Sequence, residues 1–227
     1  MIEIIPAVIP KDMNEIRDKV VQMRGIVSFV QIDIMDGKFV EAKTWPFFPK
    51  DKRGVEEIMK EEAGMPYWDE INYEFDLMVE DAGRDIEKYV ALGASRLIFH
   101  FEAESKLQEN LENMEPYIRN MVQIGLAFDI ATDVLEVLPF IPLVDFVQCM
   151  GINKDGVQGE PFDEKAIGHI KAVRKVYPEI PISVDGGVNL SNAKSLIEAG
   201  ATRLVSGSTI WRSFDAEQTI KEFQSLV

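Results

Sequence analysis

Apolar, β-branched segments alternate with amphipathic helical segments along the chain, and this alternation limits the fold more than any other feature. Strand–helix repeats without low-complexity linkers predict a parallel sheet with right-handed crossovers. Eight such units of about 28 residues each fit a (β/α)8 TIM barrel that forms a single domain over residues 1–227. A doubly wound open sheet is the alternative. It is disfavoured because no G-x-G-x-x-G motif follows the first strand.

The predicted elements follow from apolar runs and from apolar positions spaced three and four residues apart. The strands are expected at residues 2–9, 27–34, 71–78, 96–101, 125–130, 144–150, 181–184 and 203–206. The helices are expected at residues 11–24, 55–63, 82–92, 106–121, 134–138, 164–176, 191–199 and 216–226. Residues 41–52 combine Pro, aromatic and charged residues and predict a long loop.

The composition excludes several classes of partner. The net charge of −15 argues against binding to nucleic acid or to an anionic membrane, since both need a basic surface. The single Cys149 excludes an internal disulfide framework and a Cys-based zinc cluster. No apolar run approaches the roughly 18 residues of a membrane span, and the N-terminus has no signal pattern. We therefore expect a cytoplasmic protein in which local groups hold any anionic substrate.

Acidic residues gather where the predicted strands end, which is where the site of a TIM barrel lies. Asp33 and Asp185 follow buried β-branched residues, and Asp76 and Asp129 end two further strands. Acids on converging strand ends cannot all ionise without a counter-charge, so a metal cation, a shared proton or a cationic substrate is implied. Helix or turn capping is the favoured alternative for Asp129 and Asp36. His100, at another strand end, is as easily a core histidine as a functional one.

Two glycine-containing dipeptides follow the last two strands and predict an anion site. Gly186 and Gly187 come after the seventh strand, and Gly207 and Ser208 come after the eighth. Glycine lets backbone N–H groups approach an anion closely, and these two loops commonly bind phosphate in α/β barrels. Either dipeptide alone would be explained by a tight turn. Three methionines also lie at strand ends, where gap-filling in the core is their ordinary role: Met35, Met78 and Met150.

Five motifs, taken together, resemble ribulose-phosphate 3-epimerases. QIDIMDGKFV at residues 31–40 resembles H-x-D-[IV]-M-D-G-x-F-V, and SVDGGVN at 183–189 resembles V-D-G-G-[IV]-N. Three supporting motifs are FDLMVE at 75–80, FHFEA at 99–103 and GSTI at 207–210. The matches keep their order from the first strand to the eighth, so the resemblance covers essentially the whole chain.

The resemblance implies an isomerase that epimerises a phosphorylated ketose. In such a reaction, Asp33 and Asp185 would work from opposite faces of the substrate. One would remove the proton α to the carbonyl, and the other would return a proton to the resulting enediolate. The methionines Met35, Met78 and Met150 would match the apolar cap of the family.

The resemblance also implies a divalent metal, held in the family by two Asp and two His. Asp33 and Asp185 match the two Asp, while Gln31 and Asp76 stand where the two His would be. A site of Asp33, Asp76, Asp185 and Gln31 favours Mg²⁺ or Mn²⁺ over Zn²⁺ or Fe²⁺. A site without metal is the alternative.

The chain departs from the family in its substrate contacts. Ala7 replaces a Ser, and the loop of residues 150–160 lacks a Pro and is about one residue longer. Gly156 in this loop remains a candidate anion contact, and Lys154 would compensate with charge. The implied partners are a sugar phosphate and further copies of the chain. A lyase of the hexulose-phosphate aldolase or decarboxylase type and a non-catalytic sugar-phosphate binding protein are the alternatives.

Overall fold

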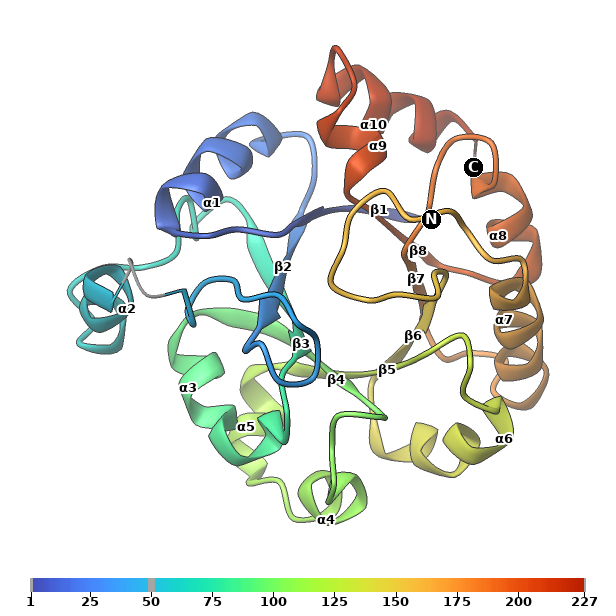
Figure 1. The fold of residues 1–227 in the computed structure, drawn as a ribbon, viewed down its shortest axis with the longest axis horizontal. Helices are drawn as coiled ribbons and strands as arrows, with labels where there is room; N and C mark the ends of the chain where they lie inside the picture. Colours follow the sequence, from blue (N-terminus) through green and yellow to red (C-terminus); the bar gives the residue numbers. More distant parts are fainter. Residues whose placement is uncertain (1, 49–51, 227) are drawn as a thin grey trace.

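The computed structural model describes residues 2–48 and 52–226, which form a closed barrel of parallel strands (Figure 1). The strands pair in chain order from β1 to β8, so the predicted (β/α)8 barrel is confirmed. The predicted loop at 41–52 is irregular as far as residue 48, and residues 49–51 lie outside the described part. The strands are β1 (Glu3–Val8), β2 (Phe29–Met35), β3 (Asn72–Met78), β4 (Ala94–His100), β5 (Gln123–Phe128), β6 (Phe146–Met150), β7 (Ile182–Asp185) and β8 (Arg203–Ser206).

Helices surround the barrel, and one predicted helix is divided. The predicted helix at 106–121 is wrong as a single element, because Pro116 begins a new helix after Glu115 leaves the helical region at ψ 134°. The helices are α1 (Met13–Val20), α2 (Lys52–Met59), α3 (Ile86–Ala91), α4 (Leu107–Glu112), α5 (Pro116–Met121), α6 (Val134–Val137), α7 (Lys165–Val176), α8 (Ala193–Ala199), α9 (Ser208–Trp211) and α10 (Ala216–Ser225), with 3₁₀ turns η1 (Val21–Met23), η2 (Ala82–Asp85) and η3 (Leu138–Leu143).

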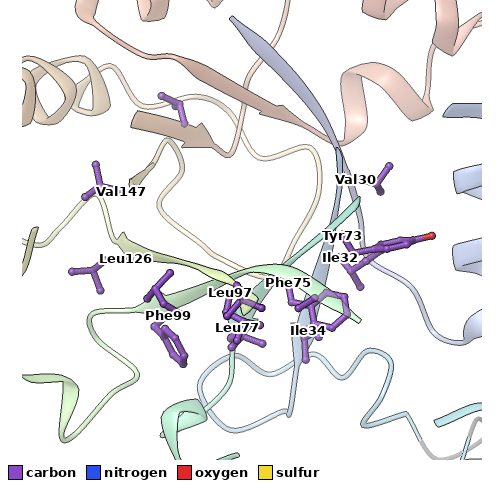
Figure 2. Packing of buried hydrophobic residues seen from close by; sticks show 14 of the residues in the cluster. Val30, Ile32, Ile34, Tyr73, Phe75, Leu77, Leu97, Phe99, Leu126 and Val147 are labelled. Carbon is purple, nitrogen blue, oxygen red and sulfur yellow. The ribbon is translucent and has the colours of Figure 1, made fainter. Parts of the chain in front are cut away.

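Alternate residues of each strand face the helices and form the main core. Figure 2 shows these residues on neighbouring strands, among them Ile32, Phe75 and Leu97, all fully buried. Complete burial of each such side chain contributes about 1.5–3 kcal/mol. The other set of alternating residues points into the barrel, so a polar residue at one of these positions enters the interior.

The barrel interior is layered from the N-terminal to the C-terminal ends of the strands. The lowest layer holds an ion cluster in which Nη1 of Arg96 pairs with Glu3 and Glu74 at 3.1 and 3.0 Å. Above it lie two small clusters of buried apolar side chains, one containing Ile98 and the other containing Val205. The uppermost layer holds the acids at the strand ends. A packed interior of this kind leaves only the upper mouth for chemistry.

The loop of residues 151–164 between β6 and α7 (gold in Figure 1) crosses the mouth of the barrel in this view. Its backbone is anchored near both ends, since the N–H of Gly151 donates to the carbonyl of Asp185 and the N–H of Asp163 donates to the carbonyl of Gly151. Among the described residues, no helix combines the length and apolar character needed to cross a lipid bilayer.

Candidate active site

Three carboxylates meet at the mouth of the barrel, as the strand ends predicted. Asp33 and Asp76 are register partners on β2 and β3, and Asp185 ends β7 beside Met150 of β6. One carboxylate oxygen from each acid lies within 4.8 Å of the other two. We call Asp33, Asp76 and Asp185 the acid cluster. Closure of the barrel brings together residues that are 152 positions apart in the chain, here Asp33 and Asp185.

The amide of Gln31 bridges two members of the acid cluster. Its Nε2 donates to Oδ1 of Asp33 at 2.8 Å and to Oδ2 of Asp185 at 2.7 Å. Gln31 lies two residues before Asp33 on β2, so both side chains point into the barrel. The two acids are thereby held in a fixed relative position. Oε1 of Gln31 is buried and has no hydrogen-bond partner among the residues that the structure describes.

Burial and mutual repulsion keep protons on this pair. Burial raises the pKa of Asp33 well above its usual range, and the nearby carboxylates of Asp185 and Asp76 raise it further. Burial and the charge of Asp76 raise the pKa of Asp185 to about 7, although the hydrogen bond from Gln31 opposes this rise. Near neutral pH, therefore, the pair can hold one protonated and one ionised carboxyl group.

Asp76 contacts two residues outside the acid cluster, His100 and Gln148. Its Oδ1 lies 2.7 Å from Nε2 of His100, and its Oδ2 accepts from Nε2 of Gln148 at 3.3 Å. Burial lowers the pKa of His100, but the charge and hydrogen bond of Asp76 outweigh burial and raise it to about 10. His100 is thus a buried histidine that contacts the acid cluster through Asp76. Sequence reasoning missed Gln148, although a Gln inside the apolar strand VDFVQCM was a usable signal.

The acid cluster adjoins a small cavity that contains the predicted phosphate-binding residues. This cavity, of about 40 Å³, is lined by Asp33, Asp185, Met78, Met150, Gly156, Gly186, Gly187, Gly207 and Ser208. Met35 does not line it and instead lies beneath the loop, with its sulfur 3.3 Å from the position of a Cβ on Gly156. Such a volume has room for only a few water molecules.

Gln158, from the same loop, occupies the space in front of the last glycine turn. Its Nε2 donates to the carbonyl of Ala7 at 3.2 Å, and it lies 2.5 Å from the position of a Cβ on Gly207. Trp211 donates to the same carbonyl from Nε1 at 2.6 Å. Gln158 was not recognised from the sequence, because its approach depends on the path of an irregular loop.

The donor set suits a hard divalent cation. The acid cluster offers three carboxylates, and the buried Oε1 of Gln31 would be a fourth oxygen donor if the amide were turned over. Oxygen-rich sites favour Mg²⁺ or Mn²⁺, whereas imidazole suits Zn²⁺ or Fe²⁺. The acidic groups at the mouth can therefore hold a metal, as predicted. The predicted ligand role of Gln31 requires that rotation, because Nε2 faces the acids here.

One further acid, Asp36, caps the turn after β2. Oδ1 of Asp36 accepts from the backbone N–H groups of Lys38 and Phe39 at 2.8 and 3.4 Å, which is the predicted turn capping. Asp129 differs, because within the described part of the chain its buried Oδ1 has no hydrogen-bond partner. Capping therefore does not account for that atom.

Comparisons with known proteins place the chain among sugar-phosphate enzymes. Residues 3–211 match the model of the "Ribulose-phosphate 3 epimerase family". A ribulose-phosphate 3-epimerase of Bacillus subtilis is 29% identical, with 99% of each chain covered. One of Schizosaccharomyces pombe is 28% identical over 99% of this chain and 93% of its own length. One of Chlamydia trachomatis is 33% identical over 79% of this chain and 72% of its own length.

Solved structures agree with the fold. KGPDC from Streptococcus mutans, solved as a ligand complex, has a TM-score of 0.72 at 13% identity, covering 98% of this chain and 95% of its own. A 3-hexulose-6-phosphate synthase has a TM-score of 0.69 at 15% identity, covering 99% of both chains. At these identities the likeness concerns the barrel alone. The match over residues 3–211 carries the assignment: the chain belongs to the ribulose-phosphate 3-epimerase family.

Proposed function

We propose that this protein epimerises carbon 3 of a phosphorylated ketose, with ribulose 5-phosphate as the first substrate to test. The observation that carries the proposal is the Asp33–Asp185 pair, bridged by one amide and buried beside the glycine turns. A 1,1-proton transfer needs two acid–base groups, one on each face of the reacting carbon. The family match supports this isomerase over the lyase alternative.

The pKa order of the pair suggests the roles in one direction of the reaction. Asp185, with a pKa of about 7, is partly ionised at neutral pH and serves as the base that removes the proton α to the carbonyl. Asp33, whose pKa burial raises well above its usual range, holds the proton that is returned to the opposite face. In the reverse direction the two carboxyl groups exchange these roles.

We propose Asp33, Asp76 and Asp185 as the metal-holding residues, with Mg²⁺ or Mn²⁺ preferred. When bound, such a cation would stabilise the negative charge of the enediolate. The chain itself excludes water by closing the loop of residues 151–164 and orients the substrate through the turns at Gly186, Gly187, Gly207 and Ser208. Met78 and Met150 would form the apolar wall beside the reacting carbons, and Met35 would support the loop at Gly156.

The experiment is deuterium incorporation from D₂O at the α-carbon of ribulose 5-phosphate, followed by NMR, with inversion measured by a coupled assay. The protein is stripped of metal and then tested with Mg²⁺, Mn²⁺, Zn²⁺ and Fe²⁺ in turn. We expect exchange together with inversion, which Asp33→Asn abolishes while ketose-phosphate binding is kept. Asp69→Asn, at an exposed position, is the control and leaves both unchanged.

The other outcomes separate the alternatives. Exchange without inversion would indicate the half-reaction of a lyase. Binding of ketose phosphates without exchange under any of the four metals would indicate a non-catalytic binding protein. Full exchange in Asp33→Asn would refute the two-acid scheme.

We also propose that the chain forms a homo-oligomer. Several large apolar side chains lie at the surface, including Phe214, fully exposed, and Trp68, 70% exposed. Aromatic side chains are enriched at protein interfaces, so Phe214 and Trp68 are candidates for burial against a second copy. Sedimentation velocity would measure the mass of the assembly, and a species of 25.7 kDa would refute this proposal.

A further inference from the structure

A second group of acids surrounds His100 near the C-terminal ends of β4 and β5. The group consists of His100 at the end of β4, Glu102 just after it, Asp129 after β5 and Asp155 in the β6–α7 loop; we call it the rim cluster. Ligand atoms of His100, Glu102 and Asp129 lie within 4.8 Å of one another. Oδ2 of Asp155 lies 4.0 Å from Nδ1 of His100.

Two buried atoms of the rim cluster have no hydrogen-bond partner among residues 2–48 and 52–226. They are Nδ1 of His100, on a side chain that is 0% exposed, and Oδ1 of Asp129. Leaving a buried polar atom unpaired costs the free energy of removing that atom from water. The two atoms belong to side chains that contact Asp155, so both unpartnered atoms lie in one small region of the structure.

The second nitrogen of His100 is already fixed. Nε2 lies 2.7 Å from Oδ1 of Asp76, so in the neutral ring an N–H donated to that carboxylate leaves the lone pair on Nδ1, and a cation that binds Nδ1 takes the place of the proton held there by the imidazolium form. A carboxylate that orients a histidine whose other nitrogen binds metal is the common outer support of metal sites. Asp76 supplies that support here.

A bound cation would compensate the negative charge of the carboxylates in the rim cluster. The carboxyl groups of Asp155 and Asp129 are in side-chain contact beside Nδ1 of His100, and two neighbouring carboxylates cannot both ionise without compensation. In the described part of the chain, the hydrogen bonds of the Glu102 carboxylate reach its Oε1, which accepts from the N–H of Asp129 and from the hydroxyl of Thr132.

We propose that the rim cluster is a second divalent-cation site, with Nδ1 of His100 and carboxylate oxygens of Asp129, Asp155 and Glu102 as ligands. One imidazole with carboxylates suits a transition cation such as Zn²⁺ or Mn²⁺. The proposed ligands of this site differ from those of the acid cluster, and the hydrogen bond between His100 and Asp76 links the two.

The position of Asp155 gives this site a consequence for the substrate pocket. Asp155 directly precedes Gly156–Gly159, which line the cavity beside the Asp33–Asp185 pair. A cation held between Asp155 and residues of β4 and β5 would pin this loop to the barrel. Occupancy would therefore favour the closed mouth.

The experiment uses the fact that the chain has only two histidines, His100 and His169. Protein labelled with ¹⁵N-histidine carries Asp33→Asn and Asp185→Asn, so that two carboxylate ligands of the acid cluster are removed. Zn²⁺ is added to the stripped protein at pH 8, and the ring nitrogens are followed by NMR. We expect the Nδ1 signal of His100 to move and to saturate at one equivalent. His169, in α7, is the internal reference.

Two variants make the test specific. Asp155→Asn in the same background should weaken Zn²⁺ binding on the order of tenfold or more. Glu41→Gln, an exposed residue beside the cavity that contains Asp129 and Asp155, controls for general attraction and should leave the affinity unchanged. An unmoved His100 signal, or equal affinity after Asp155→Asn, would overturn the proposal. If the double background fails to fold, the same titrations on the otherwise unchanged chain decide.

Discussion

At the scale of single residues, the site depends on which polar atom faces which acid. Gln31 and Gln148 are both fully buried glutamines pointing into the barrel, and each has an unpartnered Oε1. They differ in what their Nε2 contacts. Gln31 bridges Asp33 and Asp185, whereas Gln148 contacts only Asp76 among the acids, at a longer distance of 3.3 Å. This contrast allows the bridging amide to be tested against a matched neighbour.

Gln31→Leu should shift the pH dependence of exchange. The hydrogen bond from Gln31 lowers the pKa of Asp185, so its loss raises that pKa above about 7. The base is then ionised only at higher pH, and the acidic limb of the pH–rate profile moves upward. A rise from about 7 to about 8 would reduce the ionised fraction at neutral pH roughly fivefold. The measurement is the rate of deuterium exchange between about pH 5 and 9.

Gln148→Leu is the control for lost volume and polarity in the same interior layer. It leaves the two bonds to Asp33 and Asp185 in place, so the acidic limb should stay where it is. If both variants lower the rate equally without moving the limb, Gln31 acts through packing alone.

At the scale of elements, the turn after β7 needs its glycines for space as well as for conformation. Gly187 has φ +68°, and a Cβ there would lie 2.7 Å from the backbone of Phe162 in the β6–α7 loop. A backbone atom cannot give way as the end of a flexible side chain can. The turn after β7 and the loop that covers the site therefore pack so closely at this contact that a Cβ at Gly187 would clash.

Gly187→Ala should destabilise the protein by about 1–3 kcal/mol and weaken phosphate-ester binding, because it combines a strained φ with a backbone clash. Gly168→Ala is the matched control. That glycine lies in the exposed face of α7 with nothing within 4 Å of its added Cβ, so alanine should stabilise the helix by about 0.5–1 kcal/mol. Urea unfolding measures both. Equal effects of the two substitutions would contradict the fitted contact.

Elements were predicted from the sequence better than the contacts between them. The eight strands follow from apolar runs, and Asp33, Asp76 and Asp185 converge because parallel strands end at one edge. The direction of a side chain around the barrel does not follow from that pattern. Hence the pairing of Asp76 with His100 and the approach of Gln158 to Ala7 were not foreseen.

At the scale of the whole molecule, a cluster of ion pairs fills the barrel interior at the N-terminal ends of the strands. Arg96 on β4 joins Glu3 of β1 and Glu74 of β3, and Arg203 of β8 also contacts Glu3 at 3.2 Å. Four strands are thus tied together across the interior. Breaking one partner of a buried pair leaves an uncompensated charge, whereas the net contribution of the intact pair is small. The stability of the barrel should therefore respond to the protonation of Glu74.

Glu74→Gln should remove a specific pH dependence of stability. Burial raises the pKa of Glu74 to about 7 despite the opposing charge of Arg96. The folded protein then holds a proton that the unfolded chain releases near 4.5, so the contribution of Glu74 is full below pH 4.5 and lost as pH rises through about 7. The stability of the unmodified chain relative to the variant should fall by an amount on the order of 3 kcal/mol between about pH 4.5 and 8.

Urea unfolding at several pH values measures this difference, and Glu70→Gln is the control. The pKa of Glu70 lies below its usual range because of its exposed hydrogen bond with Arg24, so its contribution changes only at lower pH. A difference for Glu74→Gln that stays constant across this window would show that the ion pair keeps Glu74 charged inside the barrel.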